Sequence, residues 1–193
     1  MSTSKKRPGG NVRIIGGELR SRKISFPDAA GLRPSADRVR ETLFNWLQMA
    51  IPAARVLDLF AGSGALGFEA ASRGASSVVM VEKAKVAANA LRDNRDALAT
   101  TAVQIIEADA LIWLRRDAGK QRFDLVFLDP PFDANQHYEA AHTLAESGCL
   151  APGALVYIES AEPLDEAKLP SNWTGRKIKR AGAVHSYQNT NYL

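Results

Sequence analysis

LDLFAGSGALGFEAASRG (residues 57–74) is an apolar run that breaks at a glycine-rich loop and continues as a helical pattern. Gly62, Gly64 and Gly67 fit the G-x-G-x-x-G template of a turn that carries a nucleotide-like ligand between a strand and a helix. Glu82 lies twenty positions past Gly62, at the end of the next apolar run, where a carboxylate comes beside a ribose. We expect Gly62 and Gly64 to face the ligand and Gly67 to permit close helix packing. The template is also compatible with a dinucleotide as the ligand.

A second informative run is FDLVFLDPPF (residues 123–132), in which another apolar strand pattern ends in Asp129, Pro130, Pro131 and Phe132. An acid, two prolines and an aromatic at the end of a strand would suit a planar substrate, such as one with an amino nitrogen whose lone pair is delocalised into a ring and which is therefore a poor nucleophile. The Asp129 carboxylate and the Pro130 carbonyl could accept its protons, while the two prolines fix the geometry. Phe132 offers a face for stacking on a base. The plain alternative is an ordinary turn after a strand.

From Arg55 onward, short β-prone runs alternate with helical segments. The β-prone runs are RVLDLF (55–60), SVVMVE (77–82), VQIIEA (103–108), FDLVFLD (123–129) and ALVYIES (154–160). Helices are expected from about Ala65, Ala84, Leu111 and Gln136. This alternation predicts an α/β fold with a doubly wound, mainly parallel central sheet, in which the 123–129 strand lies next to the first. The tail from Trp173 to Leu193 predicts a final antiparallel pair.

The N-terminal part of the sequence does not follow this alternation of strands and helices. Residues 1–11 are polar and basic, and we expect a disordered arm there. Two β-prone runs flank Gly16-Gly17, a pair suited to a tight hairpin turn. Ser35 is a candidate cap for a helix that continues through Gln48. We therefore expect a small hairpin and helix extension over residues 12–52, followed by the main domain over 53–193.

Charge is unevenly distributed along the 193 residues. Residues 1–40 carry ten Lys/Arg against three Asp/Glu, residues 41–167 carry ten against eighteen, and residues 168–193 carry five against none. Both ends are therefore basic around an acidic middle. A polyanion such as RNA would be attracted to them through phosphate neutralisation. The alternative is that these are solvated surface charges.

Other features of the composition exclude several classes of protein. Cys149 is the only thiol, so neither an intramolecular disulfide nor a multi-cysteine metal site is expected. The N-terminal charges are followed by no apolar stretch, and no uninterrupted apolar run approaches eighteen residues. We expect a cytoplasmic protein without a membrane segment or a metal.

DLFAGSGALGFEA resembles the first motif of class I S-adenosylmethionine-dependent methyltransferases, in which an acid precedes the glycine loop. The resemblance implies a Rossmann-like class I methyltransferase fold with S-adenosylmethionine as cofactor. Glu82 would accept both ribose hydroxyls, and Asp109, with the Ala110 backbone nearby, would contact the adenine; a helix cap is the alternative for Asp109. The methionine part would be held by Asp58 and by the loop that contains Phe60, Gly62, Ser63 and Gly64.

The four residues from Asp129 to Phe132 resemble the [DN]PP[FYW] motif of methyltransferases that act on exocyclic amino groups. RIIGGELRSRKISFP and LRPSADRVRETLFNWL look like the opening of the bacterial 16S rRNA guanine-N2 methyltransferases of the RsmD type, a resemblance over roughly residues 12–160. It implies N2 methylation of one guanine in 16S rRNA, on the small ribosomal subunit or an assembly intermediate. Basic side chains of the extension would contact the RNA: Arg13, Arg20, Arg22, Lys23, Arg33, Arg38 and Arg40.

Several alternatives stay open on the sequence. The amino motif is shared with DNA adenine-N6 and protein glutamine methyltransferases, although a target-recognition domain for DNA is not recognisable in this chain. An NAD-dependent oxidoreductase would use the same glycine template but would leave DPPF unexplained. A non-catalytic RNA-binding assembly protein would need only the basic ends. We expect a monomer.

Overall fold

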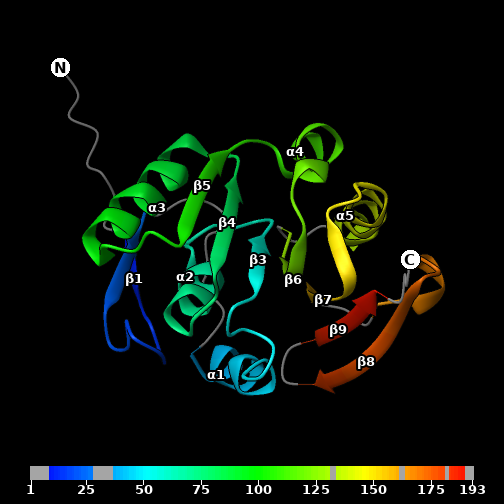
Figure 1. The fold of residues 1–193 in the computed structure, drawn as a ribbon, viewed down its shortest axis with the longest axis horizontal. Coiled ribbons are helices and arrows are strands. Elements are labelled where there is room, and N and C mark those ends of the chain that lie inside the picture. The colour runs from blue at the N-terminus through cyan, green and yellow to red at the C-terminus, as the bar shows by residue number, and fades with distance from the viewer. Residues whose placement is uncertain (1–8, 28–36, 131–133, 161–163, 181–182, 190–193) are drawn as a thin grey trace.

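The computed structural model describes residues 9–27, 37–130, 134–160, 164–180 and 183–189. Its centre is a sheet in which seven described strands follow the order β5-β4-β3-β6-β7-β9-β8 (Figure 1). The first five of these are parallel neighbours, whereas β9 is antiparallel to β7 and β8. The strands are β3 (Arg55–Asp58), β4 (Ser77–Glu82), β5 (Val103–Glu107), β6 (Phe123–Leu128), β7 (Leu150–Ser160), β8 (Trp173–Arg180) and β9 (Ala183–Asn189).

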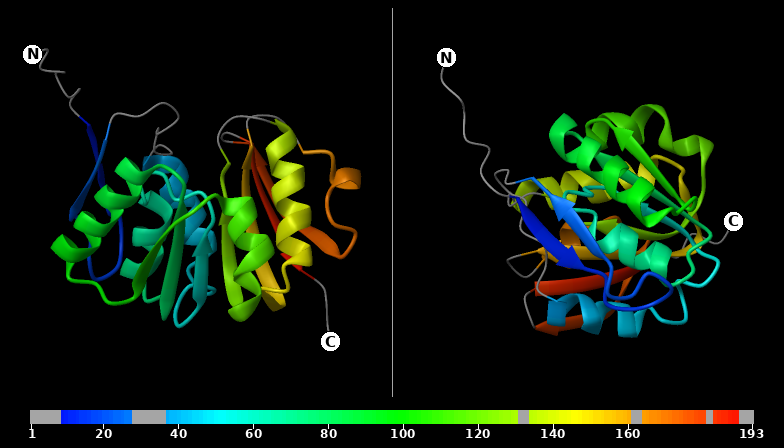
Figure 2. Two further views of the ribbon diagram at one scale, coloured as in Figure 1. Left: turned by 90° about the horizontal axis from the view of Figure 1, so that it is seen from above. Right: turned by 90° about the vertical axis from the view of Figure 1, so that its left-hand side faces the viewer.

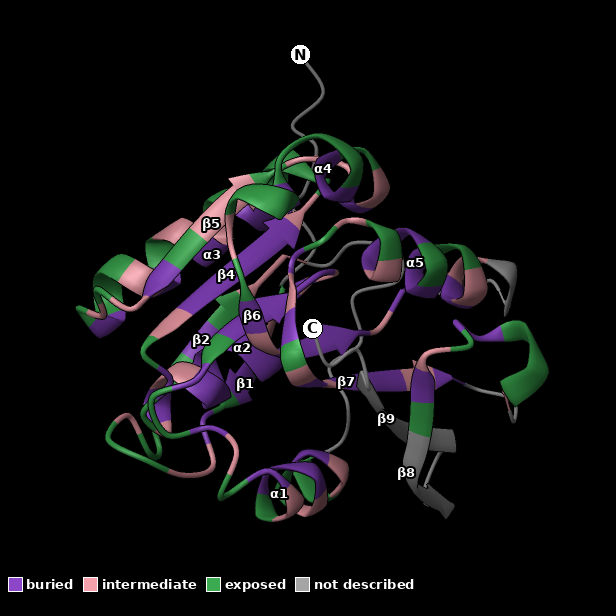
Figure 3. Cartoon of the chain, turned by 45° about the vertical axis from the view of Figure 1, so that its right-hand side comes forward, coloured by how far each residue is buried: buried purple, intermediate pink, exposed green. Residues whose placement is uncertain are grey.

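The inner strands contain continuous apolar runs, as expected for strands that are covered on both faces of the sheet. In β4 the four residues from Val78 to Val81 are all buried, whereas the edge strand β5 is mostly intermediate or exposed (Figure 3). On one face lie α1 (Asp37–Trp46), α2 (Ala65–Ser72) and α3 (Lys85–Leu98), and on the other lie α4 (Ala110–Arg116) and α5 (Ala134–Glu146). Short 3-10 turns, η1 (Ala118–Lys120) and η2 (Glu166–Lys168), complete the described elements.

The predicted alternation of strands and helices is confirmed, with boundaries that differ by a few residues. The 123–129 strand, now β6, pairs directly with β3, as expected. The C-terminal antiparallel pair is also present as β8 and β9. Cys149 follows α5 and is buried, and its sulfur accepts a hydrogen bond from the Ser147 hydroxyl. No described helix is both long and apolar enough to cross a bilayer.

The hairpin differs from the expectation of a tight turn at Gly16-Gly17. Its strands, β1 (Gly10–Arg13) and β2 (Lys23–Phe26), are separated by residues 14–22. Gly17 has φ of +75°, but it is a contact point rather than a turn centre, because a Cβ there would lie 1.8 Å from the Ser72 carbonyl oxygen. The glycine pair therefore allows the connection to approach the C-terminal end of α2.

Side chains of α2 and α3 bind the hairpin through its backbone. Glu69 of α2 is fully buried and accepts hydrogen bonds from Ile15 N–H (2.7 Å) and Gly16 N–H (2.8 Å). On α3, the Asn94 amide bonds to both the N–H and the carbonyl of Ser25. The hairpin consequently lies alongside α3 as a docked element, which Figure 2 shows from two directions.

Candidate functional site

The glycine-rich loop after β3 turns at two glycines. Gly62 and Gly64 have φ of +51° and +78°, a region that favours glycine. Gly64, which was expected to face the ligand, packs on the core, because a Cβ there would lie 2.5 Å from the Leu91 side chain. Gly67 packs as expected, since a Cβ there would come within 2.4 Å of the Met80 side chain. Its N–H donates to Asp58 Oδ2 over 3.0 Å. The loop and the start of α2 are therefore held against the ends of β3 and β4.

Glu82 connects this loop to the end of β4. Its Oε2 accepts a hydrogen bond from Gly62 N–H (2.9 Å), and its Oε1 accepts one from Ala84 N–H (2.7 Å). A carboxylate oxygen has room for more than one donor. Glu82 can thus hold the loop and still accept hydroxyl donors from a ribose.

Asp58 is a buried acid at the carboxyl end of β3. Burial raises its pKa to about 7; the Gly67 hydrogen bond opposes that rise and the charge of Glu82 adds to it. Placing a carboxyl group here costs free energy unless a cation or hydrogen-bond donors compensate for the lost water. The buried acid therefore suits a positively charged ligand. Phe60 and Ser63 lie in the same loop, half-buried and buried respectively.

Asp109 caps α4, as its alternative interpretation proposed. Its Oδ1 accepts from Leu111 N–H and Ile112 N–H, while Oδ2 pairs with Lys83 Nζ at 3.0 Å. The Lys83 hydrogen bond is the main cause that holds the pKa of Asp109 below its usual value. Ala110 is buried in the first turn of α4. Both residues follow β5 and lie one strand beyond Glu82.

Asp129 and Pro130 directly follow β6. Burial, together with the carboxylates of Glu159 and Asp58, raises the pKa of Asp129 to about 8. Leu128 pairs with Ile158 of β7, so Asp129 and Glu159 are the next residues on two adjacent strands. Pro131, Phe132 and Arg33, which the sequence also singled out, lie outside the described residues.

Strand alternation gathers these acids on one face of the sheet. Phe127 and Tyr157 pack in the core on the side of α1, with ring centroids 6.0 Å apart. Asp129 and Glu159 lie two residues further along and share that face. The carboxyl edge therefore presents a row of carboxylates from β4, β3, β6 and β7: Glu82, Asp58, Asp129 and Glu159. Among the described residues no group of three or more acids, histidines or cysteines could hold a metal ion.

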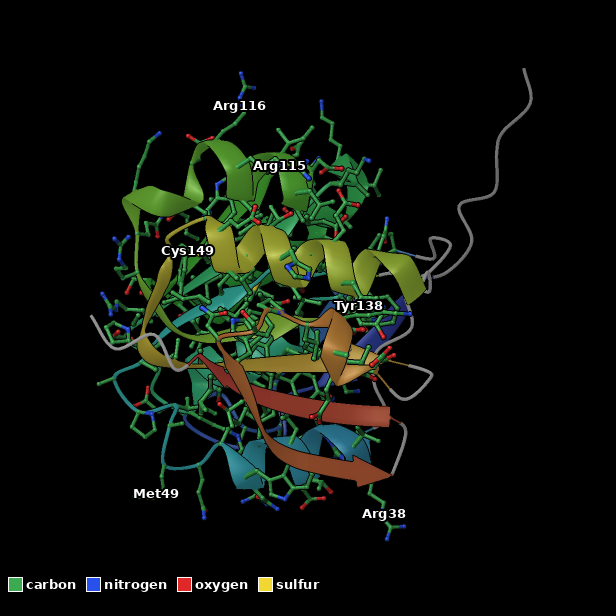
Figure 4. All side chains as sticks on the ribbon, turned by 90° about the vertical axis from the view of Figure 1, so that its right-hand side faces the viewer. Arg38, Met49, Arg115, Arg116, Tyr138 and Cys149 are labelled. Atoms are coloured by element: carbon green, nitrogen blue, oxygen red, sulfur yellow. The ribbon has the colours of Figure 1, made fainter. Side chains whose placement is uncertain are left out.

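The basic residues of the extension separate into three environments. Arg13 and Arg20 line a hollow of about 260 Å³ between the hairpin and α1. Arg22 and Lys23 are exposed, but Arg22 donates to the Ala97 carbonyl at the end of α3. Arg38 projects from α1 into solvent (Figure 4).

Arg40 departs from the expectation that it lines an entrance for RNA. It is only 1% exposed, and its Nη2 donates to Asp37 Oδ1 (2.7 Å) and to the Arg13 carbonyl (3.0 Å). Helical periodicity directs position 40 toward the core together with Leu43 and Phe44. In this structure Arg40 joins α1 to the hairpin and does not belong to the exposed basic surface.

Three residues near the site were not singled out by the sequence analysis. Glu159 and Tyr157 both lie on β7, and His137 lies on α5. Glu159 could have been found from its position at the end of an apolar run, the same signal that identified Glu82. The others needed the tertiary contacts described below.

Comparisons with known proteins agree on one family. The family model described as Conserved hypothetical protein 95 matches residues 12–188. A Haemophilus influenzae protein named ribosomal RNA small subunit methyltransferase D is 44% identical over 185 residues, covering 93% of this chain and 95% of that protein. A solved structure of the Escherichia coli yhhF protein is 41% identical, with a TM-score of 0.85 over 93% of this chain and 98% of that one.

A more distant structure supports the fold alone. It is a Thermus thermophilus 16S rRNA N2 methyltransferase (RsmC) in complex with AdoMet and guanosine, 23% identical, with a TM-score of 0.68 over 94% of this chain and 49% of that one. The predicted α/β, mainly parallel, Rossmann-like fold is thereby confirmed as one shared with methyltransferases.

Proposed function

This chain belongs to the family described as Conserved hypothetical protein 95, which includes the ribosomal RNA small subunit methyltransferase D proteins, and on that premise we propose that it is an S-adenosylmethionine-dependent rRNA methyltransferase that modifies the exocyclic N2 of a guanine in 16S rRNA. The observation that carries the proposal is the juxtaposition of two strand ends. β3, with Asp58 and the glycine loop, pairs with β6, which leads into Asp129 and Pro130.

The residues at the carboxyl edge fit the proposed cofactor by charge. Apart from the carboxylate of its methionine part, S-adenosylmethionine carries an ammonium group, a sulfonium, two ribose hydroxyls and an amino group, all of them cationic or hydrogen-bond donors. The carboxyl edge of the sheet supplies carboxylates that can accept hydrogen bonds from these groups. We assign the methionine end to Asp58 and the loop with Phe60, Gly62, Ser63 and Gly64, the ribose to Glu82, and the adenine to Asp109 and Ala110.

The chemistry follows from what the chain adds to an activated methyl group. When bound, the cofactor supplies a methyl whose bond to sulfur breaks with the electron pair going to the sulfur. The Asp129 carboxylate and the Pro130 carbonyl accept the amino protons, so the N2 lone pair is directed at that methyl. The new N–C bond forms from this lone pair, and one amino proton leaves, for which Asp129 is the nearest acceptor that we assign.

The RNA would approach from the side of the extension. The exposed side chains of Arg13, Arg20, Lys23 and Arg38 lie on the hairpin and α1, which pack on the same sheet face as the acids. Their positive charge balances the repulsion that the acidic edge would exert on phosphates.

The test is methyl transfer itself. Small subunits and 16S rRNA from cells that lack this gene are incubated with the enzyme and tritiated S-adenosylmethionine, and the rRNA is digested to nucleosides. Label in N2-methylguanosine is the expected result. Label in N6-methyladenosine, or in DNA or protein, would redirect the substrate assignment. Calorimetric binding of NAD in place of S-adenosylmethionine would overturn the cofactor.

A further inference from the structure

Glu159 is held at two points beside the proposed reaction centre. Its carboxylate Oε2 accepts a hydrogen bond from the Tyr157 hydroxyl (3.2 Å), and its backbone carbonyl lies 2.7 Å from His137 Nε2. A carbonyl oxygen accepts, so His137 donates from a protonated Nε2. Two largely buried aromatic side chains, one on β7 and one on α5, thus fix a residue that the proposed function does not yet use.

Glu159 also lies next to Asp129, and its charge contributes to the raised pKa of that carboxyl group. The two residues follow the paired Leu128 and Ile158, and their charges repel each other. Burial and these same carboxylates raise the pKa of the Tyr157 hydroxyl, so that hydroxyl stays a donor. An edge made of adjacent acceptors is stabilised when hydrogen-bond donors enter between them.

Guanine presents such a row of donors. Its N1–H lies next to its N2 amino group, which gives three N–H bonds on one edge. Adenine and 2,6-diaminopurine have an unprotonated N1, an acceptor that a carboxylate repels. Asp129 and Pro130 account for the N2 protons in the proposed function, which leaves the neighbouring N1–H for an acceptor on the next strand.

We propose, on the basis of the proposed function, that Glu159 accepts the N1–H of the target guanine and so determines specificity for guanine, with Tyr157 and His137 as positioning residues. Glu159 is longer than Asp129 by one methylene, which suits reaching past the amino group to the ring. The amino group is then bound by the β6 end and the ring edge by the β7 end.

The experiment measures nucleoside binding to the full-length enzyme saturated with S-adenosylhomocysteine, by ligand-observed NMR titration. Guanosine, inosine and 2,6-diaminopurine riboside are compared. Inosine lacks only the N2 amino group, so it reports on Asp129. The diaminopurine keeps that amino group but lacks N1–H and carries an amino group in place of O6, so the change in its relative affinity caused by Glu159→Gln reports on Glu159.

Wild-type enzyme should bind guanosine at least about tenfold tighter than the diaminopurine riboside, since a wrong base edge costs that much or more. Glu159→Gln should abolish this preference, because an amide can also donate to an unprotonated N1, while it preserves the preference over inosine. Tyr157→Phe should reduce the guanosine preference by a smaller factor. Glu146→Gln, an exposed glutamate on α5, is the matched control and should change neither ratio.

A Glu159→Gln variant that melts like wild type and keeps the guanosine preference would overturn the inference, as would equal or undetectable binding of both nucleosides by wild type. If Glu159→Gln proves to be destabilised, Tyr157→Phe provides the test. An unchanged ratio of guanosine affinity to diaminopurine affinity in Tyr157→Phe would overturn the positioning role. Failure of the proposed function looks different, since wild-type enzyme would then transfer no methyl to rRNA whatever its nucleoside preference.

Discussion

Glu82 Oε2 accepts a hydrogen bond from the N–H of Gly62 over 2.9 Å, although the two residues lie twenty positions apart in the chain. The carboxylate that the glycine template predicts beside a ribose is therefore also a structural support of the glycine loop. Cofactor binding and loop conformation depend on the same side chain. This dual role sharpens what a substitution at Glu82 should do.

Glu82→Gln should weaken S-adenosylmethionine binding by about tenfold to a hundredfold. The amide keeps one acceptor oxygen, so its NH2 group must face either a backbone N–H or a ribose hydroxyl, a loss of about 1–3 kcal/mol. Isothermal titration calorimetry measures the dissociation constant of S-adenosylmethionine. Glu107→Gln, at the end of the neighbouring β5, is the matched control. An unchanged dissociation constant for Glu82→Gln would contradict the ribose assignment.

Asp129→Ala should lower the methyl-transfer rate and leave cofactor affinity unchanged. Hydrogen bonds to the amino protons strengthen as the nitrogen becomes pyramidal, so their loss acts on the transition state. Single-turnover rates should fall by about 10²–10³-fold, the range for removing one such electrostatic contact. Asp129→Asn keeps an acceptor oxygen and should lose less. Rates near wild type for the alanine variant would refute the role.

The folding stability should decrease as pH rises from about 4 to about 8. Asp58 and Asp129 have folded pKa values raised to about 7 and about 8. Each group binds its proton more tightly in the folded state, so stability is fully present below the unfolded pKa and is lost as pH rises toward the folded pKa. The slope is at most about 1.4 kcal/mol per pH unit for each group.

Asp58→Asn isolates one of these contributions. Asparagine keeps an oxygen acceptor for Gly67 N–H but has no charge to bury. Urea denaturation at pH 5 and pH 8 should show a smaller pH-dependent loss of unfolding free energy in this variant than in wild type. Identical losses in the two proteins would show that Asp58 is already ionised at pH 5.

Replacing Arg13, Arg20 and Lys23 by alanine should weaken RNA binding in a salt-dependent way. All three side chains are exposed on the hairpin. Each phosphate contact contributes about 0.7–0.9 to the slope of log K against log salt, so the slope should fall by up to about 2–3. Parallel lines for the two proteins would mean that these charges are merely solvated. Lys120→Ala, on η1, is the control, and cofactor binding should stay constant.

Glu69→Ala should release the hairpin and destabilise the protein by about 3–5 kcal/mol, as for other buried charged networks that lose one partner. It leaves Ile15 N–H, Gly16 N–H and the Arg73 guanidinium without their acceptor. Urea denaturation gives the cost, and hydrogen exchange at Ile15 and Gly16 should accelerate. Unchanged protection at both amides would show that the hairpin is held by its apolar contacts. Glu146→Ala, exposed on α5, should change neither.

The sequence by itself determined the parallel core and identified the residues of the candidate site. Runs such as SVVMVE are apolar on both faces, which only a covered sheet accommodates, and the glycines after β3 are required by their positive φ angles and by close packing on Met80. Asp129 was recognisable because a strand pattern, an acid and two prolines occur together. These are local properties, expressed over a few consecutive residues.

Only the tertiary structure decided which side chains share an environment. Helical periodicity places position 40 on the core side of α1, but an arginine is normally expected to be exposed, so the sequence did not show that Arg40 joins Asp37 and the hairpin. The proximity of Asp129 to Glu159 depends on the β6–β7 register, which brings together residues thirty positions apart. Burial and long-range pairing depend on the whole folded chain. They determine the charges around residues that the sequence could identify but could not place in space.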